Sequence, residues 1–142
     1  MATDITLRLD KYQELAATYG RDCEVISVPC PGLAGRIERG DLAAADLREM
    51  IRGYVGSFAG TVGSVVLGCT HYPFVRRQIA EVLGGDVRFY DGGAGTARQL
   101  RHRLGECGLL ADEAHAGSVS FASSEDTPDE LALYREFFEM EL

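Results

Sequence analysis

The sequence has 142 residues, of which 46% are hydrophobic, 8% aromatic and 25% charged. These proportions are those of an ordinary globular domain and exclude fibrous and disordered classes. The longest apolar run, Val65–Leu67, is far too short to span a bilayer. The first residues also lack the basic and apolar regions of a signal peptide. We therefore expect a cytoplasmic protein that has no membrane association.

The net charge of −8 is concentrated near the end of the chain. Residues 112–142 contain nine acids and one base, which gives −8, so residues 1–111 balance to zero with 13 acids and 13 bases. We interpret the acidic segment as a solvated face that aids solubility. Because an acidic surface repels phosphate backbones, we do not expect nucleic acid as a partner.

The four cysteines are Cys23, Cys30, Cys69 and Cys107. In a cytosolic chain they should be reduced thiols. They show no Cys-x-x-Cys spacing, so neither a zinc knuckle nor a redox motif is indicated. A structural cysteine usually behaves as a small buried hydrophobe, and we expect this of Cys23, Cys107 and Cys30.

The first part of the chain predicts alternating helices and strands. Thr3–Thr6 is typical of a strand end or a helix cap. Apolar residues at helical spacing predict a helix over Asp10–Tyr19. A β-branched run predicts a strand over Cys23–Val28, and a short helix is expected over Gly32–Glu38.

The central part contains the clearest helix, predicted over Asp41–Phe58 with Asp41 as its N-cap. Ser64–Leu67 is predicted to be a strand buried on both faces, as in a parallel sheet. A turn follows at Gly68–Tyr72. Pro73 suits the start of the next helix, which the apolar spacing extends to Leu83.

The last part predicts a strand over Val87–Tyr90, a helix over Thr96–Leu104, a strand over Ser118–Ala122 and a helix over Asp129–Glu139. Strands and helices that alternate at these lengths indicate an α/β fold with a mostly parallel sheet flanked by helices.

The hexapeptide Gly68-Cys69-Thr70-His71-Tyr72-Pro73 is the segment most indicative of chemistry. It lies between a predicted strand and a helix, and ligands of parallel sheets bind at the carboxyl ends of strands. Free amides and the helix dipole at such a position favour a carboxylate or a thiolate. Thr70 adds a hydroxyl, and His71 can hold a proton near neutral pH.

Each of these residues has a simpler interpretation when taken alone. A cysteine after a buried strand is more often a packing residue, and a histidine at a helix start is more often a cap. Zinc could use Cys69 and His71, but no second pair completes a tetrahedron, so we expect no metal.

The loop Gly92–Gly95 lacks the full Gly-x-Gly-x-x-Gly spacing of a nucleotide site. A tight turn is the better interpretation.

The complete hexapeptide resembles the second cysteine motif of the glutamate racemases. Three flanking segments agree with that family in order and spacing: Ala2–Thr6 with Tyr12, Cys30–Leu33 with Ile37-Glu38, and Val87–Asp91. The resemblance covers nearly the whole chain and is firmest over residues 2–105. It implies an isomerase, without cofactor, that makes D-glutamate for peptidoglycan, and hence for cell-wall biogenesis and cell shape.

The resemblance also implies a two-cysteine mechanism, in which one thiol removes the α-proton and the other returns a proton on the opposite face. Cys69 would be one of the pair, and His71 would assist it. Glu38 lies where the family has an acidic residue that supports this side of the site. Thr70 would bind the polar groups of the substrate, and Thr6 would line the site.

By the same resemblance, the chain is expected to be a C-terminal portion of such an enzyme. Residues 1–88 would form the second racemase α/β domain without most of its first strand, and residues 89–142 would return to complete the first domain. The Cys-Asn-Thr motif expected to carry the partner cysteine does not occur in the sequence. We therefore expect the chain alone to be inactive or nearly so, and to need the N-terminal half or a second subunit, for example in a homodimer.

Two alternatives are retained. One is an aspartate or hydantoin racemase, which uses the same two-cysteine mechanism. The other is a non-catalytic chain that acts as a binding or oligomerisation module, since an incomplete sheet exposes edges and apolar surface.

Overall fold

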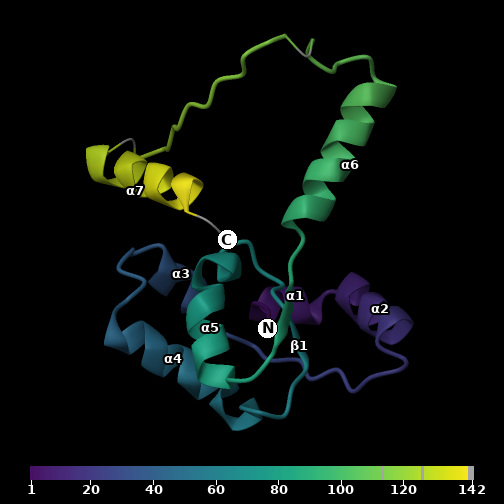
Figure 1. Cartoon of the computed structure of the whole chain (residues 1–142), viewed down its shortest axis with the longest axis vertical. Coiled ribbons are helices and arrows are strands. Elements are labelled where there is room, and N and C mark those ends of the chain that lie inside the picture. Colours follow the sequence, from purple (N-terminus) through teal and green to yellow (C-terminus); the bar gives the residue numbers. More distant parts are fainter. Residues whose placement is uncertain (113, 126, 141–142) are drawn as a thin grey trace. The chain divides into compact units, whose positions relative to one another are not determined.

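A small parallel sheet organises the first part of the chain (Figure 1). In the computed structural model, which describes residues 1–112, 114–125 and 127–140, strand β1 (Ser64–Val66) pairs in parallel with strand β2 (Arg88–Tyr90). The register places Val65 opposite Phe89. Both strands lie where the apolar patterns predict them, and their parallel pairing confirms the predicted α/β class.

Single bridges extend this parallel arrangement. Ala2 forms one bridge with Pro29 and another with Gly68, both parallel. The Ala2 amide donates to the carbonyl of Val28, and the Ala2 carbonyl accepts from the amide of Cys30. The residues that follow Ala2, Pro29 and Gly68 therefore lie at one edge of the sheet, because parallel segments end on the same side.

Two predicted strands do not form. Cys23–Val28 has no strand ladder, and only the adjacent Pro29 bridges to Ala2. Ser118–Ala122 is also without strand structure. A β-branched run supplies local propensity, but a strand also needs a neighbour to receive its hydrogen bonds. In the described part of the chain the first run has only the single bond from the Ala2 amide to Val28, and the second run pairs with no strand.

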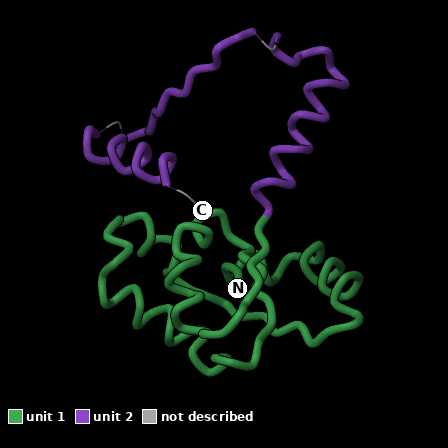
Figure 2. Tube along the Cα trace, viewed as in Figure 1, with its two compact units in different colours: residues 1–91 green, residues 92–142 purple. Residues whose placement is uncertain are grey.

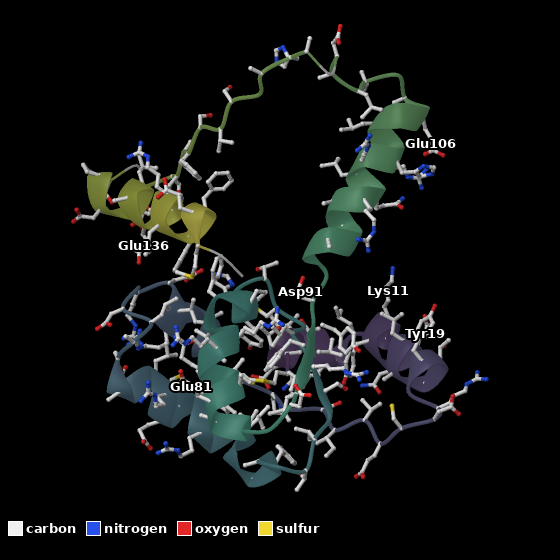
Figure 3. All side chains as sticks on the ribbon, viewed as in Figure 1. Lys11, Tyr19, Glu81, Asp91, Glu106 and Glu136 are labelled. Carbon is white, nitrogen blue, oxygen red and sulfur yellow. The ribbon has the colours of Figure 1, made fainter. Side chains whose placement is uncertain are left out.

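Two helices follow the first bridge. Helix α1 (Asp4–Arg8) is capped by Thr3, whose hydroxyl accepts from the amide of Thr6, so the cap interpretation of this segment is confirmed. Helix α2 (Asp10–Tyr19) has the predicted bounds but no buried residue. Figure 3 shows Lys11 and Tyr19 projecting from it, and Tyr19 is 80% exposed.

The hydrophobic core lies among α3 (Leu33–Ile37), α4 (Ala45–Val55) and α5 (Arg76–Leu83), together with the 3₁₀ turn η2 (Tyr72–Val75). Helix α4 packs along α5, and a second 3₁₀ turn, η1 (Gly56–Phe58), extends α4. The apolar side chains that these helices bury are Leu33, Ile37, Leu47, Ile51, Val55, Tyr72, Val75, Ile79 and Leu83.

Two predictions about this region are wrong in detail. Asp41 is not the N-cap of α4; it lies in the preceding turn with φ 44°, and the cap position is Ala44. Aspartate tolerates this left-handed conformation better than most residues. Strand β1 is buried on one face only, because Val65 is buried whereas Val66 is 62% exposed.

The remaining residues contain two longer helices. Helix α6 (Gly93–Glu106) begins inside the glycine loop, earlier than the predicted Thr96. Helix α7 (Pro128–Glu139) is capped by the Thr127 side chain and lies where predicted. Its Phe138 ring meets Phe121 edge to face, with 5.6 Å between the ring centroids.

The chain divides into two compact units, residues 1–91 and 92–142 (Figure 2). The expected assignment of residues 1–88 and 89–142 to two racemase domains remains a prediction. Of the acidic residues near the end of the chain, Glu113, Asp126 and Glu141 lie outside the described residues. None of the described helices is both long and apolar enough to cross a membrane.

Candidate active site

Cys69 leaves the sheet directly after Gly68, at the edge where the parallel segments end. The backbone approaches closely here: a Cβ on Gly68 would lie 3.1 Å from the Cβ of Ala2 and 3.1 Å from the carbonyl oxygen of Met1. A larger residue at this position would require Ala2 or Met1 to shift by a few tenths of an ångström, so glycine suits the close pairing of Ala2 beside β1. The cysteine that follows is half-buried, and its sulfur has the His71 ring as a polar neighbour.

Cys69, His71 and Glu38 form a continuous chain of polar contacts. The Cys69 Sγ lies 3.7 Å from Nδ1 of His71. The other ring nitrogen, Nε2, lies 2.8 Å from Oε1 of Glu38. The structure therefore brings together the three residues that the sequence singled out as catalytic candidates, although Glu38 is 33 positions from His71 in the sequence.

This geometry assigns a direction to the imidazole. An ionised carboxylate can only accept hydrogen bonds, so the His71 Nε2 that faces Glu38 carries a proton. In neutral His71, Nδ1 is then the unprotonated nitrogen, and it faces the Cys69 thiol. Thr70 also lies at this nitrogen, with its Oγ1 3.4 Å from Nδ1.

The group remains open to solvent. The side chain of His71 is 28% exposed and that of Glu38 is 61% exposed. Glu38 is the C-cap residue of α3, and its amide donates to the carbonyl of Ala34. The end of α3 therefore presents its carboxylate to the turn after β1, at a place that a small polar molecule can reach.

Tyr72 fixes the other side of this turn. It is fully buried, and its hydroxyl donates to the carbonyl of Cys30 across 3.3 Å. Burial raises the pKa of the Tyr72 phenol, so the hydroxyl stays neutral as a donor. The sequence points to Tyr72 only through its place inside the hexapeptide. Nothing in the spacing of residues predicts that its hydroxyl bonds to Cys30.

The other cysteines differ from Cys69 in their surroundings. Cys30 is buried as expected, at 1% exposure, and burial raises the pKa of its thiol. It therefore remains neutral and acts as a packing residue. Cys23 and Cys107 are exposed, so the prediction that they pack inside is wrong.

Thr6 is not joined to Cys69 by the contacts of the described residues. Its hydroxyl lies 2.9 Å from that of Thr3, inside the capping arrangement of α1. Thr3 itself follows Ala2, which pairs with Gly68. The start of α1 therefore reaches the same sheet edge as Cys69, and this sheet order is the support for a site-lining role.

Metal ligation finds no support in these groups. Across residues 1–112, 114–125 and 127–140, no group of three or more histidine, cysteine or acidic side chains is placed to hold an ion. The thiol, imidazole and carboxylate of this site can transfer protons among themselves.

Curated proteins similar in sequence to this chain are glutamate racemases. A glutamate racemase of Clostridium botulinum is 36% identical over 140 residues, which cover 98% of this chain and 54% of the relative. One of Pseudomonas putida is 45% identical over 127 residues, covering 89% of this chain and 48% of the relative. The chain is a homologue of glutamate racemases over nearly its whole length.

Solved glutamate racemases agree with this assignment. A crystal structure from Francisella tularensis, described in complex with D-glutamate, superposes with a TM-score of 0.69 at 25% identity, over 92% of this chain and 49% of that one. A Thermus thermophilus structure superposes with a TM-score of 0.62 at 26% identity, over 90% of this chain and 49% of that one. No protein-family model matches the sequence. The chain spans about half the length of the curated glutamate racemases that it matches.

Proposed function

We propose that the chain supplies one side of the active site of an amino-acid racemase that interconverts L- and D-glutamate without a cofactor. The observation that carries this proposal is the contact chain from Cys69 through His71 to Glu38. Its half-buried thiol and oriented imidazole provide a base for one face of a substrate carbon. The Francisella tularensis relative described with D-glutamate supports glutamate as the substrate.

The proton path follows from the orientation of His71. The Cys69 thiol gives its proton to Nδ1, which leaves a thiolate beside an imidazolium. Glu38 stabilises that imidazolium through Nε2. The thiolate then takes the α-proton of the amino acid, and the electron pair stays on the α-carbon. In the reverse direction the Cys69 thiol returns a proton to the same face.

Inversion also needs an acid on the opposite face, because a single thiol cannot reach both sides of a tetrahedral carbon. Cys30, the other cysteine at this sheet edge, is buried. We therefore propose that a second cysteine comes from the part of a glutamate racemase that this chain does not match, or from a second subunit. By this proposal the chain alone racemises glutamate slowly or not at all.

Thr70 and Thr6 are proposed to bind the polar groups of the substrate. Thr70 is exposed and lies next to Nδ1 of His71. Thr6 lies near the start of α1, which begins at the same sheet edge. We further propose that the enzyme acts in the cytoplasm and supplies D-glutamate for peptidoglycan. The relatives named glutamate racemase support the formation of D-glutamate.

The test is formation of D-glutamate from L-glutamate by the chain, first alone and then combined with the part of the Pseudomonas putida relative that it does not match. We expect turnover from the combination and little from the chain alone. Rapid turnover by the chain alone would contradict the need for a second thiol, and a folded but silent combination would contradict the racemase proposal. Aspartate and hydantoins, assayed in parallel, separate the related racemase activities.

A non-catalytic role is the second candidate, and the uncovered face of the sheet favours it. Val66 is 62% exposed and Tyr90 is 52% exposed, and they are register partners on β1 and β2. A chain that only binds a partner through such a surface would keep its assembly when Cys69 is replaced. Loss of activity without loss of assembly therefore separates the two functions.

A further inference from the structure

Arg36 is the one buried charged residue in the part of the chain that the structure describes, at 6% exposure. It lies in the last turn of α3, two positions before Glu38. A buried guanidinium must satisfy its donors within the protein. The partners that it uses therefore show which backbone it fixes.

Four hydrogen bonds leave the guanidinium. Two form a fork with Asp46, in which Nε lies 2.6 Å from Oδ2 and Nη2 lies 2.8 Å from Oδ1. The other two reach the backbone: Nη1 donates to the carbonyl of Gly40 across 2.9 Å, and Nη2 donates to that of Asp41 across 3.4 Å. Arg36 thus closes the connection between α3 and α4.

This connection is the backbone that carries Glu38. It turns through left-handed conformations at Gly40 (φ 70°) and at Asp41 (φ 44°), which are uncommon outside glycine although aspartate tolerates them better than most residues. Arg36 supplies a donor to the carbonyl of Gly40 and another to the carbonyl of Asp41, which also accepts from the amide of Ala44. Asp46, in the first turn of α4, holds Arg36 in that position.

We propose that Arg36 and Asp46 are positioning residues of the active site. They hold the turn after α3 so that the Glu38 carboxylate stays in contact with Nε2 of His71. Neither side chain touches Cys69 or His71 by any described contact; both act through Glu38. The consequence for catalysis rests on the proposed function, but the positioning itself can be measured without turnover.

The test uses the whole chain and reads the rate at which iodoacetamide alkylates Cys69, resolved from the other thiols by peptide mass spectrometry. Nitrogen chemical shifts of the His71 ring report the tautomer in the same samples. Glu38→Gln should slow alkylation about fivefold, because the hydrogen bond from His71 loses its charged acceptor, and Asp46→Asn should slow it by a similar factor. Glu49→Gln is the matched control, because it weakens an exposed pair with Arg52 on the same helix.

The decisive comparison is the double variant Glu38→Gln with Asp46→Asn. If Asp46 acts through Glu38, the double variant reacts no more slowly than Glu38→Gln alone. Independent, multiplied effects would overturn the proposal. Arg36→Lys keeps the buried charge but loses the paired hydrogen bonds to Asp46. If Asp46→Asn unfolds, the alkylation rate of Cys69 in Arg36→Lys, alone and combined with Glu38→Gln, makes the same comparison.

The two proposals fail in different ways. An effect of Glu38→Gln together with wild-type behaviour of Asp46→Asn and Arg36→Lys would remove the positioning role and leave the proposed function intact. No effect of Glu38→Gln on either readout would remove the support that the Glu38–His71 contact gives to the proposed function.

Discussion

At the scale of single residues, Glu38 is the member of the contact chain whose role can be isolated most cleanly, because its side chain is largely exposed. Glu38→Gln keeps an oxygen that can accept from Nε2 of His71 but removes the negative charge. A hydrogen bond to a charged group contributes about 1 kcal/mol more than one to a neutral group, so we expect kcat to fall about fivefold. Steady-state kinetics measure this in the complemented enzyme, which is the chain combined with the part of the Pseudomonas putida relative that it does not match. An unchanged kcat would contradict the role of Glu38.

Asp46 makes a prediction about acid stability. Its hydrogen bond with Arg36 lowers the pKa of the carboxyl from 3.8 to about 2. A lowered folded-state pKa stabilises the fold above the unfolded value, and this contribution disappears as the pH falls through about 2. Urea unfolding should therefore show wild type more stable than Asp46→Asn at pH 6, with a gap that closes towards pH 2. A gap that stays constant with pH would contradict the ion pair.

Residue patterns predicted the local part of the site and no more. Cys69, Thr70 and His71 are neighbours in the sequence, so their proximity follows from the chain itself. The contact of Glu38 with His71 depends on how α3 lies against the turn after β1, which no local pattern encodes; the resemblance to a known family supplied that residue. The partners of Arg36 and Tyr72 are long-range in the same way, and the sequence did not predict them.

At the scale of elements, the helices with a regular apolar stripe were predictable, and the isolated strands were not. Leu47, Ile51 and Val55 recur at helical spacing and are buried on α4. The runs over residues 23–28 and 118–122 have strand propensity but no described neighbour to pair with. Strand formation is decided by the partner as much as by the run, which is why these two predictions are wrong.

The difference in burial between α4 and α2 gives a stability prediction. Ile51 is fully buried, so Ile51→Ala should lower the free energy of unfolding by about 2–5 kcal/mol. Leu15 on α2 is 48% exposed, and Leu15→Ala should change it by no more than about 0.5 kcal/mol. Urea denaturation followed by circular dichroism compares the two. Equal losses would contradict the assignment of the core to α3, α4 and α5.

At the scale of the whole molecule, the chain matches about half of each relative, and one face of its sheet is uncovered at Val66 and Tyr90. We expect the complementary part of a racemase to cover this face. Val66→Lys combined with Tyr90→Lys should then weaken co-purification of the tagged complementary part, whereas Tyr19→Lys on the exposed end of α2 should not. Undiminished co-purification of the double variant would place the contact elsewhere.

The central claim, that Cys69 is the base and acid for one face of the substrate, is tested most directly by its replacement in the complemented enzyme. Racemisation of glutamate is compared for wild type, Cys69→Ala and the control Cys107→Ala, which removes an exposed thiol at the end of α6. Loss of an acid–base group lowers the rate by about a hundredfold or more, so Cys69→Ala should be nearly inactive and Cys107→Ala should match wild type. Turnover by Cys69→Ala at the wild-type rate would contradict the account.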